Sequence, residues 1–159
     1  MATEVYVHLF QQKLTLMPTH AERRIVPYTP EQMYALVADV EKYPEFLPWC
    51  ADLTITAKRG NIIEADTAVG FKALRESFMS RVTLMEEQRR IEVEYLNGPF
   101  RYLNNHWVFH KHPKGCEIEF YIDFEFRSKM LQLVMGAVFN EAVRIMVRSF
   151  EARAGRLYG

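Results

Sequence analysis

Three regularly spaced histidines are the first residues in this sequence that suggest chemistry. His106, His110 and His112 stand at even positions of one expected strand, so their side chains share one face of a sheet. Imidazoles at such spacing can bind zinc, but a closed site needs four ligands, and no acidic or cysteine ligand is placed to complete one. We therefore interpret the histidines as residues of a solvated sheet face and predict no metal site.

Glu76 and Asn105 are polar residues at positions expected to face a covered interior. Glu76 alternates with apolar residues of its strand, and Asn105 has the parity of Trp107. A buried carboxylate or amide needs a polar partner, so the two residues either satisfy each other, bind water or contact the polar head group of a ligand. Alternatively, Glu76 is half exposed near a sheet edge and pairs with Arg75 or Arg81.

The sequence offers no pattern that supports catalysis. It contains no glycine-rich phosphate loop, no nucleophile elbow and no convincing Ser/His/Asp spacing. Its cysteines, Cys50 and Cys116, fit small apolar core residues of a reducing compartment, and we predict that both are free thiols. The protein is therefore not expected to be an enzyme and needs no cofactor.

Length and composition predict one cytoplasmic domain. The chain has 159 residues, of which 49% are hydrophobic and 25% charged, a composition typical of one globular core. Twenty basic and twenty acidic residues give zero net charge, which argues against general nucleic-acid binding. The longest nearly apolar run, Met130 to Phe139, is too short to span a bilayer, and the N-terminus fits no secretory or transit signal.

The elements that must position these residues are mainly strands. Alternation with a period of two predicts a first strand at His20–Val26 and six more between Leu53 and Phe126, joined by short turns and hence antiparallel. Between the first two strands, Thr29 can cap a helix that starts at Pro30 and runs to about Val40. A second short helical turn is expected around Tyr43.

The last thirty residues carry apolar side chains at helical spacing. From Ser128 to Leu157 they return every three, four or seven positions, which predicts an amphipathic helix about 43 Å long. Gly136 indicates that a strand or a ligand comes close to this helix. We predict an α+β helix-grip fold: a curved seven-stranded antiparallel sheet wrapped around the C-terminal helix, with two short helices between strands 1 and 2. Whether a cavity remains or the core is fully packed stays open at this point.

Two peripheral features complete the picture. Residues 1–16 lack clear periodicity before the sequence restarts at Met17, so they are expected to form a peripheral extension of a domain over 17–159. Trp49, Phe71 and Phe100 are aromatic residues in expected turns. They either plug the ends of the sheet or form loops at a cavity mouth or against a membrane.

One segment is specific enough to indicate a family. Residues 37–50, from Val37-Ala38-Asp39 to Pro48-Trp49-Cys50, resemble the signature of the coenzyme Q-binding proteins, which are START-like domains of the polyketide cyclase superfamily. Further blocks follow in the same order: Gly70-Phe71-Lys72, Glu76-Ser77-Phe78, Ser80-Arg81-Val82, Gly98-Pro99-Phe100-Arg101-Tyr102-Leu103, Asn105-His106-Trp107, Asp123-Phe124-Glu125-Phe126 and Phe139-Asn140-Glu141. The resemblance covers about residues 17–159.

The resemblance implies a lipid-binding function. Members of the family are described as binding ubiquinone in an apolar cavity and supporting quinone synthesis and respiration, so we expect a lipid chaperone or carrier. The same superfamily contains a bacterial branch of ribosome-association toxins, whose sequences are similar over the whole domain and which bind the large ribosomal subunit and block subunit joining; the blocks above do not separate the two branches. A third alternative is an enzyme related to the polyketide cyclases and dehydratases of the superfamily.

A bound ubiquinone would place most of its surface against apolar side chains. The expected ligand is ubiquinone or another isoprenoid lipid, and peripheral contact with the inner face of the cytoplasmic membrane is compatible with this role. From parity, we expect the cavity to be lined by Phe78, Trp107, Phe120 and Phe124 of the sheet and Leu131, Met135, Val138 and Phe139 of the helix.

Overall fold

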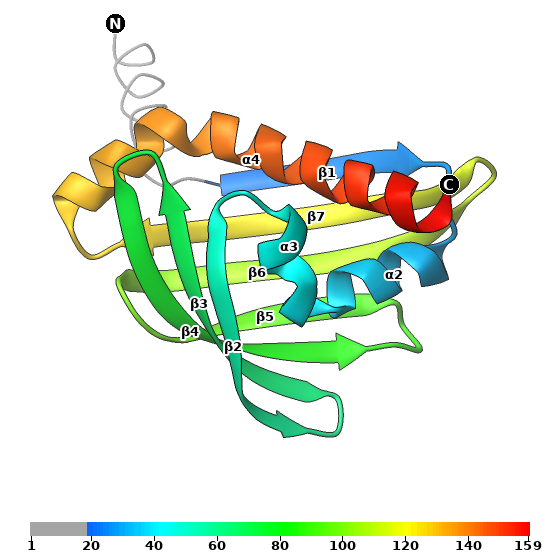
Figure 1. The fold of residues 1–159 in the computed structure, drawn as a ribbon, viewed down its shortest axis with the longest axis horizontal. Coiled ribbons are helices and arrows are strands. Elements are labelled where there is room, and N and C mark those ends of the chain that lie inside the picture. Colours follow the sequence, from blue (N-terminus) through cyan, green and yellow to red (C-terminus); the bar gives the residue numbers. More distant parts are fainter. Residues whose placement is uncertain (1–18) are drawn as a thin grey trace, which may run out of the picture.

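A single antiparallel sheet dominates the computed structural model, which describes residues 19–159 (Figure 1). The predictions for residues 1–16 and for a domain boundary at Met17 lie outside these residues. Within the described range the sheet has seven strands in the order β1-β7-β6-β5-β4-β3-β2. The strands are β1 (Thr19–Val26), β2 (Cys50–Arg59), β3 (Ile62–Phe71), β4 (Leu74–Met85), β5 (Arg90–Asn97), β6 (Phe100–His112) and β7 (Gly115–Phe126).

Short helices connect β1 to β2. Helix α2 (Pro30–Ala38) is followed by a 3-10 turn (Val40–Lys42) and helix α3 (Tyr43–Phe46). Thr29 begins α2 with a capping box, in which its side chain accepts from the Gln32 amide at 3.1 Å and the Gln32 side chain accepts from the Thr29 amide at 3.0 Å. The predicted capping is confirmed, but the helix ends at Ala38, because Asp39 leaves the helical conformation.

The long helix α4 (Lys129–Tyr158) lies across the concave side of the sheet (Figure 1). Strands β1 and β7 run beside it, and the β3–β4 hairpin rises to its first half. Irregular pairing in β2, β4 and β6 interrupts the ladders and helps the sheet to curve. The predicted α+β arrangement of a curved antiparallel sheet around a C-terminal helix is thus confirmed for the described residues.

The face that α4 buries differs in part from the predicted stripe. Its buried residues include Met135, Met146 and Phe150 as predicted, but Leu157 is 51% exposed. Gly136 is also exposed, so the predicted close approach of a strand or ligand to it is wrong. Because each residue turns the helix by about 100°, the residue after the inward-facing Met135 points away from the sheet.

By length and apolar composition alone, α4 could also cross a membrane. In the structure its Met146 and Phe150 are buried in the main hydrophobic cluster, and the Phe150 ring lies 5.3 Å from the Trp107 ring. These contacts are typical of a core helix, so we interpret α4 as a helix that packs on the concave face of the sheet rather than as a membrane span.

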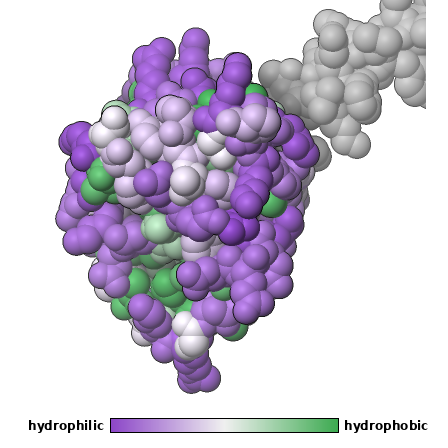
Figure 2. All heavy atoms as spheres, turned by 90° about the vertical axis from the view of Figure 1, so that its right-hand side faces the viewer, coloured by the Kyte–Doolittle hydropathy of each residue, from purple (hydrophilic) through white to green (hydrophobic). Residues whose placement is uncertain are grey.

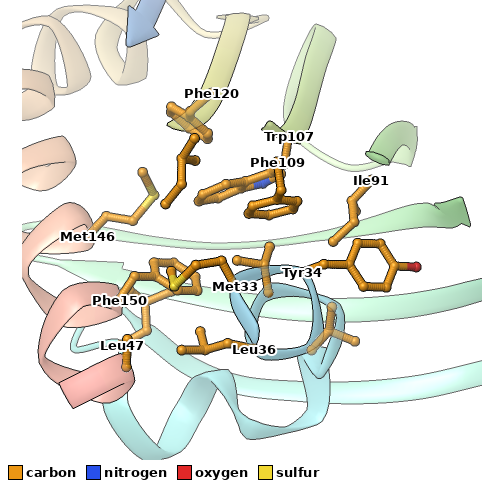
Figure 3. Packing of buried hydrophobic residues seen from close by; sticks show 14 of the residues in the cluster. Met33, Tyr34, Leu36, Leu47, Ile91, Trp107, Phe109, Phe120, Met146 and Phe150 are labelled. Carbon is orange, nitrogen blue, oxygen red and sulfur yellow. The ribbon is translucent and has the colours of Figure 1, made fainter. Parts of the chain in front are cut away.

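The described residues form two hydrophobic clusters along α4. The larger one joins the helices to the sheet at the end where α4 terminates, and Figure 3 shows Met33 of α2, Trp107 of β6 and Phe150 of α4 meeting in it. The smaller one, which includes Phe100 and Met135, lies under the start of α4. The space between sheet and α4 is bordered by both clusters.

Candidate functional site

A cavity of about 220 Å³ lies between α4 and the concave face of the sheet. Seen from the end where α4 terminates, the surface is mainly hydrophilic, with hydrophobic atoms gathered in a recess in the lower half (Figure 2). Of the two alternatives that the sequence left open, the structure therefore has the cavity rather than a fully packed core.

The cavity wall is apolar and uncharged. Among the described residues that line it there is no Asp, Glu, Lys, Arg or His. Its members with a polar group are Tyr43, Trp49, Cys50, Thr67, Ser80, Asn105 and Trp107. A charged group placed inside would be removed from water without a counter-ion, which is costly, so the wall favours a neutral ligand.

Most of the residues predicted for the cavity line it. These are Phe78, Trp107, Phe120, Phe124, Met135 and Phe139. Leu131 and Val138 do not line it; both are half-buried and pack against the smaller cluster. Val138 precedes the inward-facing Phe139 and is turned from it by about 100° around the helix, so spacing alone placed it too far inside.

Aromatic rings form much of the wall opposite β3 and β4. The Trp107 ring lies 4.5 Å from that of Phe120, and the Phe124 ring lies 5.5 Å from that of Phe139. Phe100 belongs to the same wall: it is only 6% exposed and stacks on Phe126 at 4.6 Å. Of the alternatives predicted for Phe100, contact with a membrane is wrong, because its ring is buried against Phe126.

Trp49 and Phe71 stand where β2 begins and β3 ends. Both are half-buried and line the cavity, and the Trp49 carbonyl accepts a hydrogen bond from the Gly70 amide at 2.9 Å. The partly exposed lining residues Phe139 and Ala142 approach from α4. We call the region formed by Trp49, Phe71, Phe139 and Ala142 the mouth, because here the lining reaches the surface.

An ion pair joins the β3–β4 hairpin to α4 beside the mouth. The Lys72 ammonium lies 2.7 Å from the Glu141 carboxylate and 5.7 Å from the centre of the Phe71 ring. Lys72 has a φ of 54°, and Arg75 donates to its carbonyl at 2.8 Å. Since exposed ion pairs contribute little to stability, this contact can open at small cost.

Glu76 and Asn105, the polar residues predicted to contact a ligand head group, have different environments in the structure. Glu76 is half-buried but does not line the cavity. Its predicted pairing with an arginine is wrong, because Arg75 donates to backbone carbonyls and Arg81 contacts Glu64 and Glu94. Asn105 lines the cavity, but its amide nitrogen donates to the Tyr121 carbonyl at 2.8 Å. The two residues therefore do not satisfy each other.

The titratable groups of the wall are poor acids at neutral pH. Burial raises the pKa of the Cys50 thiol to about 11, and it has the same effect on Cys116, which does not line the cavity. Tyr43 donates its hydroxyl to the Val37 carbonyl, and burial raises its pKa well above the usual range. Both cysteines are free. Because a reactive cysteine needs a lowered pKa, neither resembles a nucleophile.

The three histidines lie on the outer face of β6. The His106 ring stacks on Tyr121 at 5.3 Å, and the His112 imidazole accepts from the Lys114 amide at 3.1 Å. His110 lies 3.8 Å from the Glu119 carboxylate. Within residues 19–159, no group of three His, Cys, Asp or Glu residues could hold a metal ion. The histidines are turned away from the cavity and take no part in it.

Sequence reasoning missed three polar groups of the wall. Thr67 and Ser80 are only 7% and 4% exposed, and both line the cavity. The indole nitrogen of Trp49 is buried and has no hydrogen-bond partner. The alternation of the strand did indicate that Thr67 faces the interior, because Thr67 shares the parity of Ala65 and Val69. Small hydroxyl residues are common in strands, however, so this pattern alone did not mark Thr67 as a ligand contact.

Comparison with known families and proteins places these features in context. A family described as polyketide cyclase / dehydrase and lipid transport matches residues 26–151. The chain is 37% identical over 144 residues to a protein of Escherichia coli named ribosome association toxin RatA, covering 90% of each chain. It is 31% identical to the mitochondrial coenzyme Q-binding protein COQ10 homolog B of Xenopus laevis, covering 88% of this chain and 59% of that protein.

The fold also has solved counterparts. A START superfamily protein from Mycobacterium smegmatis superimposes with a TM-score of 0.70, at 16% identity, over 89% of this chain and 98% of that chain. At this identity the likeness shows the fold alone. The predicted helix-grip, START-like fold is thereby confirmed.

Proposed function

The chain belongs to the polyketide cyclase / dehydrase and lipid transport family, and we propose that it binds ubiquinone or a related neutral isoprenoid lipid in the cavity beneath α4. The single observation that carries this proposal is the wall itself, which is apolar and has no charged member among the described residues. Similarity to a protein named for coenzyme Q binding supports the choice of a quinone.

The physical chemistry of the wall suits such a ligand. Burial of an isoprenoid tail contributes about 2.5 kcal/mol for every roughly 100 Å² of apolar surface removed from water. Met135 and Met146 line the cavity among the aromatic rings, and flexible thioether side chains adapt to ligands of different shape. The protein therefore holds a lipid without a dedicated ionic contact.

We place this activity in the cytoplasm, with peripheral contact at the inner face of the membrane. Met130 and Leu133, at the start of α4, are 74% and 67% exposed and stand beside Lys129. Exposed apolar residues next to a cation suit reversible contact with an anionic bilayer surface. A chaperone or carrier that collects quinone there would support quinone synthesis and respiratory electron transport.

Extraction of the purified protein with organic solvent tests the proposal. Mass spectrometry of the extract should find a quinone or another neutral isoprenoid lipid at a substantial fraction of the protein concentration. An extract that holds only phospholipid, in the proportions of the host membrane, would contradict it, because phospholipid head groups are charged and the wall offers them no counter-ion.

A second candidate function is ribosome association, and the observation that favours it is the 37% identity to a protein so named. In this role the protein would bind the large ribosomal subunit and block subunit joining. Zero net charge weighs against broad contact with RNA phosphates. Sedimentation of cell extract through a sucrose gradient separates the two candidates: stable migration with the large subunit favours the toxin role, and migration at the position of the free protein favours the lipid carrier.

Catalysis of the cyclase or dehydratase type has less support. A general acid or base works best with a pKa near the operating pH. The titratable groups among the described lining residues, Tyr43 and Cys50, both have raised pKa values. We therefore propose a binding protein rather than an enzyme.

A further inference from the structure

Three hydrogen-bond donors along the cavity wall are left for a ligand. The Trp49 indole nitrogen is buried without a partner. The hydroxyls of Thr67 and Ser80 line the cavity and make no hydrogen bond to any residue in 19–159 that the structure describes. Buried polar groups in proteins are almost always hydrogen-bonded, so the unpartnered indole nitrogen, beside two hydroxyl residues in the same cavity, calls for an explanation.

The strand register places these donors on one wall. Thr67 of β3 pairs with Leu53 of β2, four residues after Trp49, and Ser80 of β4 pairs with Ala65 of β3. Ala65 and Thr67 lie two apart in β3, so their side chains are neighbours on the same sheet face. The donors thus extend from the mouth across β3 to β4.

The opposite side of the cavity has a different character. Its wall is built from rings and aliphatic chains of β6, β7 and α4, including Trp107, Phe120, Phe124 and Phe139. Asn105 and the indole of Trp107 carry the polar groups among the described lining of these elements, and the Asn105 amide nitrogen already donates to the Tyr121 carbonyl. The cavity is therefore divided into a donor wall on β2–β4 and an aromatic wall on β6, β7 and α4.

We propose that the donor wall of Trp49, Thr67 and Ser80 is a head-group subsite for a neutral lipid whose head presents carbonyl or ether oxygens, with the tail lying along the aromatic wall. This inference rests on the proposed lipid-binding function and specifies the ligand's class and orientation. An indole nitrogen can only donate, and hydroxyls can donate, so a head composed of acceptors satisfies all three groups together.

The same wall discriminates against other lipids. A fatty acid would bring a carboxylate into a cavity without a cationic lining residue among those described. A pure hydrocarbon would leave the donors unsatisfied. A hydrocarbon with the same tail should therefore enter the cavity but bind more weakly than the quinone.

Isosteric substitutions test the subsite. Thr67→Val and Ser80→Ala remove a hydroxyl and keep the shape of the wall. The matched controls are Thr83→Val and Ser77→Ala, which lie on β4 at positions that do not line the cavity. Each protein is stripped of lipid and titrated with a short-chain ubiquinone, an isoprenoid hydrocarbon of matched tail length, and oleate.

The expected result is a loss of head-group discrimination with intact tail binding. Each cavity variant should bind the quinone about three- to tenfold more weakly, while its affinity for the hydrocarbon stays the same or rises. The controls should match the natural protein. The lipid-free cavity variants should melt within a few degrees of the natural protein, because each substitution keeps the shape of the wall and breaks no hydrogen bond within the described residues.

Three outcomes would overturn the inference. Unchanged quinone affinity in both cavity variants, together with normal hydrocarbon binding, would remove the subsite and leave the lipid-binding function standing. Oleate binding as tight as quinone binding would show that head-group charge is not discriminated. If the natural protein bound neither quinone nor hydrocarbon, the proposed function would fall and the subsite with it.

Discussion

Replacing Ala142 by Trp should block the cavity without unfolding the protein. Ala142 is half-buried and lines the cavity from the middle of α4. An indole group buries on the order of 150–250 Å², worth at most about 4–6 kcal/mol at about 25 cal/mol per Å². In a filled core the same change would instead overpack and cost about 1–3 kcal/mol.

The two situations predict different melting temperatures. With a cavity of about 220 Å³ available, the gain from burial is offset by ordering the indole and by lower helix propensity. We expect the free energy of unfolding of the lipid-free protein to change by no more than about 1 kcal/mol, which corresponds to about 2–4 °C. Quinone affinity should fall at least about tenfold, or about 1.4 kcal/mol.

Ala137→Trp is the matched control, because Ala137 is exposed on the same helix. It carries the same helix-propensity cost and leaves the cavity open. Both variants are melted without lipid and then titrated with a short-chain ubiquinone. A loss of more than about 1 kcal/mol in Ala142→Trp but not in the control, as overpacking would cause, or unchanged quinone affinity in both, would refute the placement of the ligand between α4 and the sheet.

Three further predictions concern other features. Lys72→Glu should speed lipid exchange in a fluorescence transfer assay, because it replaces the attraction to Glu141 with repulsion. Adding Glu141→Lys to the same chain should restore the slow rate. Equal rates in all three proteins would show that the ion pair beside the mouth does not control lipid exchange. Alkylation of Cys50 should accelerate about tenfold per pH unit up to about pH 11, because burial raises its pKa to about 11. The stability that this pKa shift contributes should be lost as pH rises from about 9 to 11. An alkylation rate that reaches a plateau near pH 9 would contradict the burial of the thiol. Thr29→Ala should destabilise the protein by about 1 kcal/mol in a denaturant melt, since it removes the capping box of α2; no change would mean that the cap is dispensable.

Local sequence patterns predicted the elements well where neighbouring residues decide the structure. The alternation of Cys116, Ile118 and Phe120 with polar residues marks β7, and the observed burial follows it. Thr29 and Pro30 mark the start of α2 by the chemistry of the first helical turn. These signals depend on residues close in the chain, so one sequence is enough to read them.

The depth of a side chain in the fold was harder to predict. Parity placed Val138 in the cavity, and the turn residues Gly98-Pro99 placed Phe100 in a loop, whereas Val138 lies beside the cavity and Phe100 is buried in its wall. Burial depends on how far the sheet curls and how α4 is rotated over it, and residues distant in sequence set both. Thr67 and Ser80 were missed for the same reason, because their significance comes from the empty space in front of them.

The chain's own tryptophans offer the most direct test of lipid binding. Both of its tryptophans, Trp49 and Trp107, line the cavity, so a quinone bound there lies against both indoles and quenches their fluorescence. Titration of the lipid-free protein with a short-chain ubiquinone should give saturable quenching that a matched isoprenoid hydrocarbon reverses by competition. Quenching that rises linearly with quinone concentration, with no saturation and no competition, would contradict binding in the cavity.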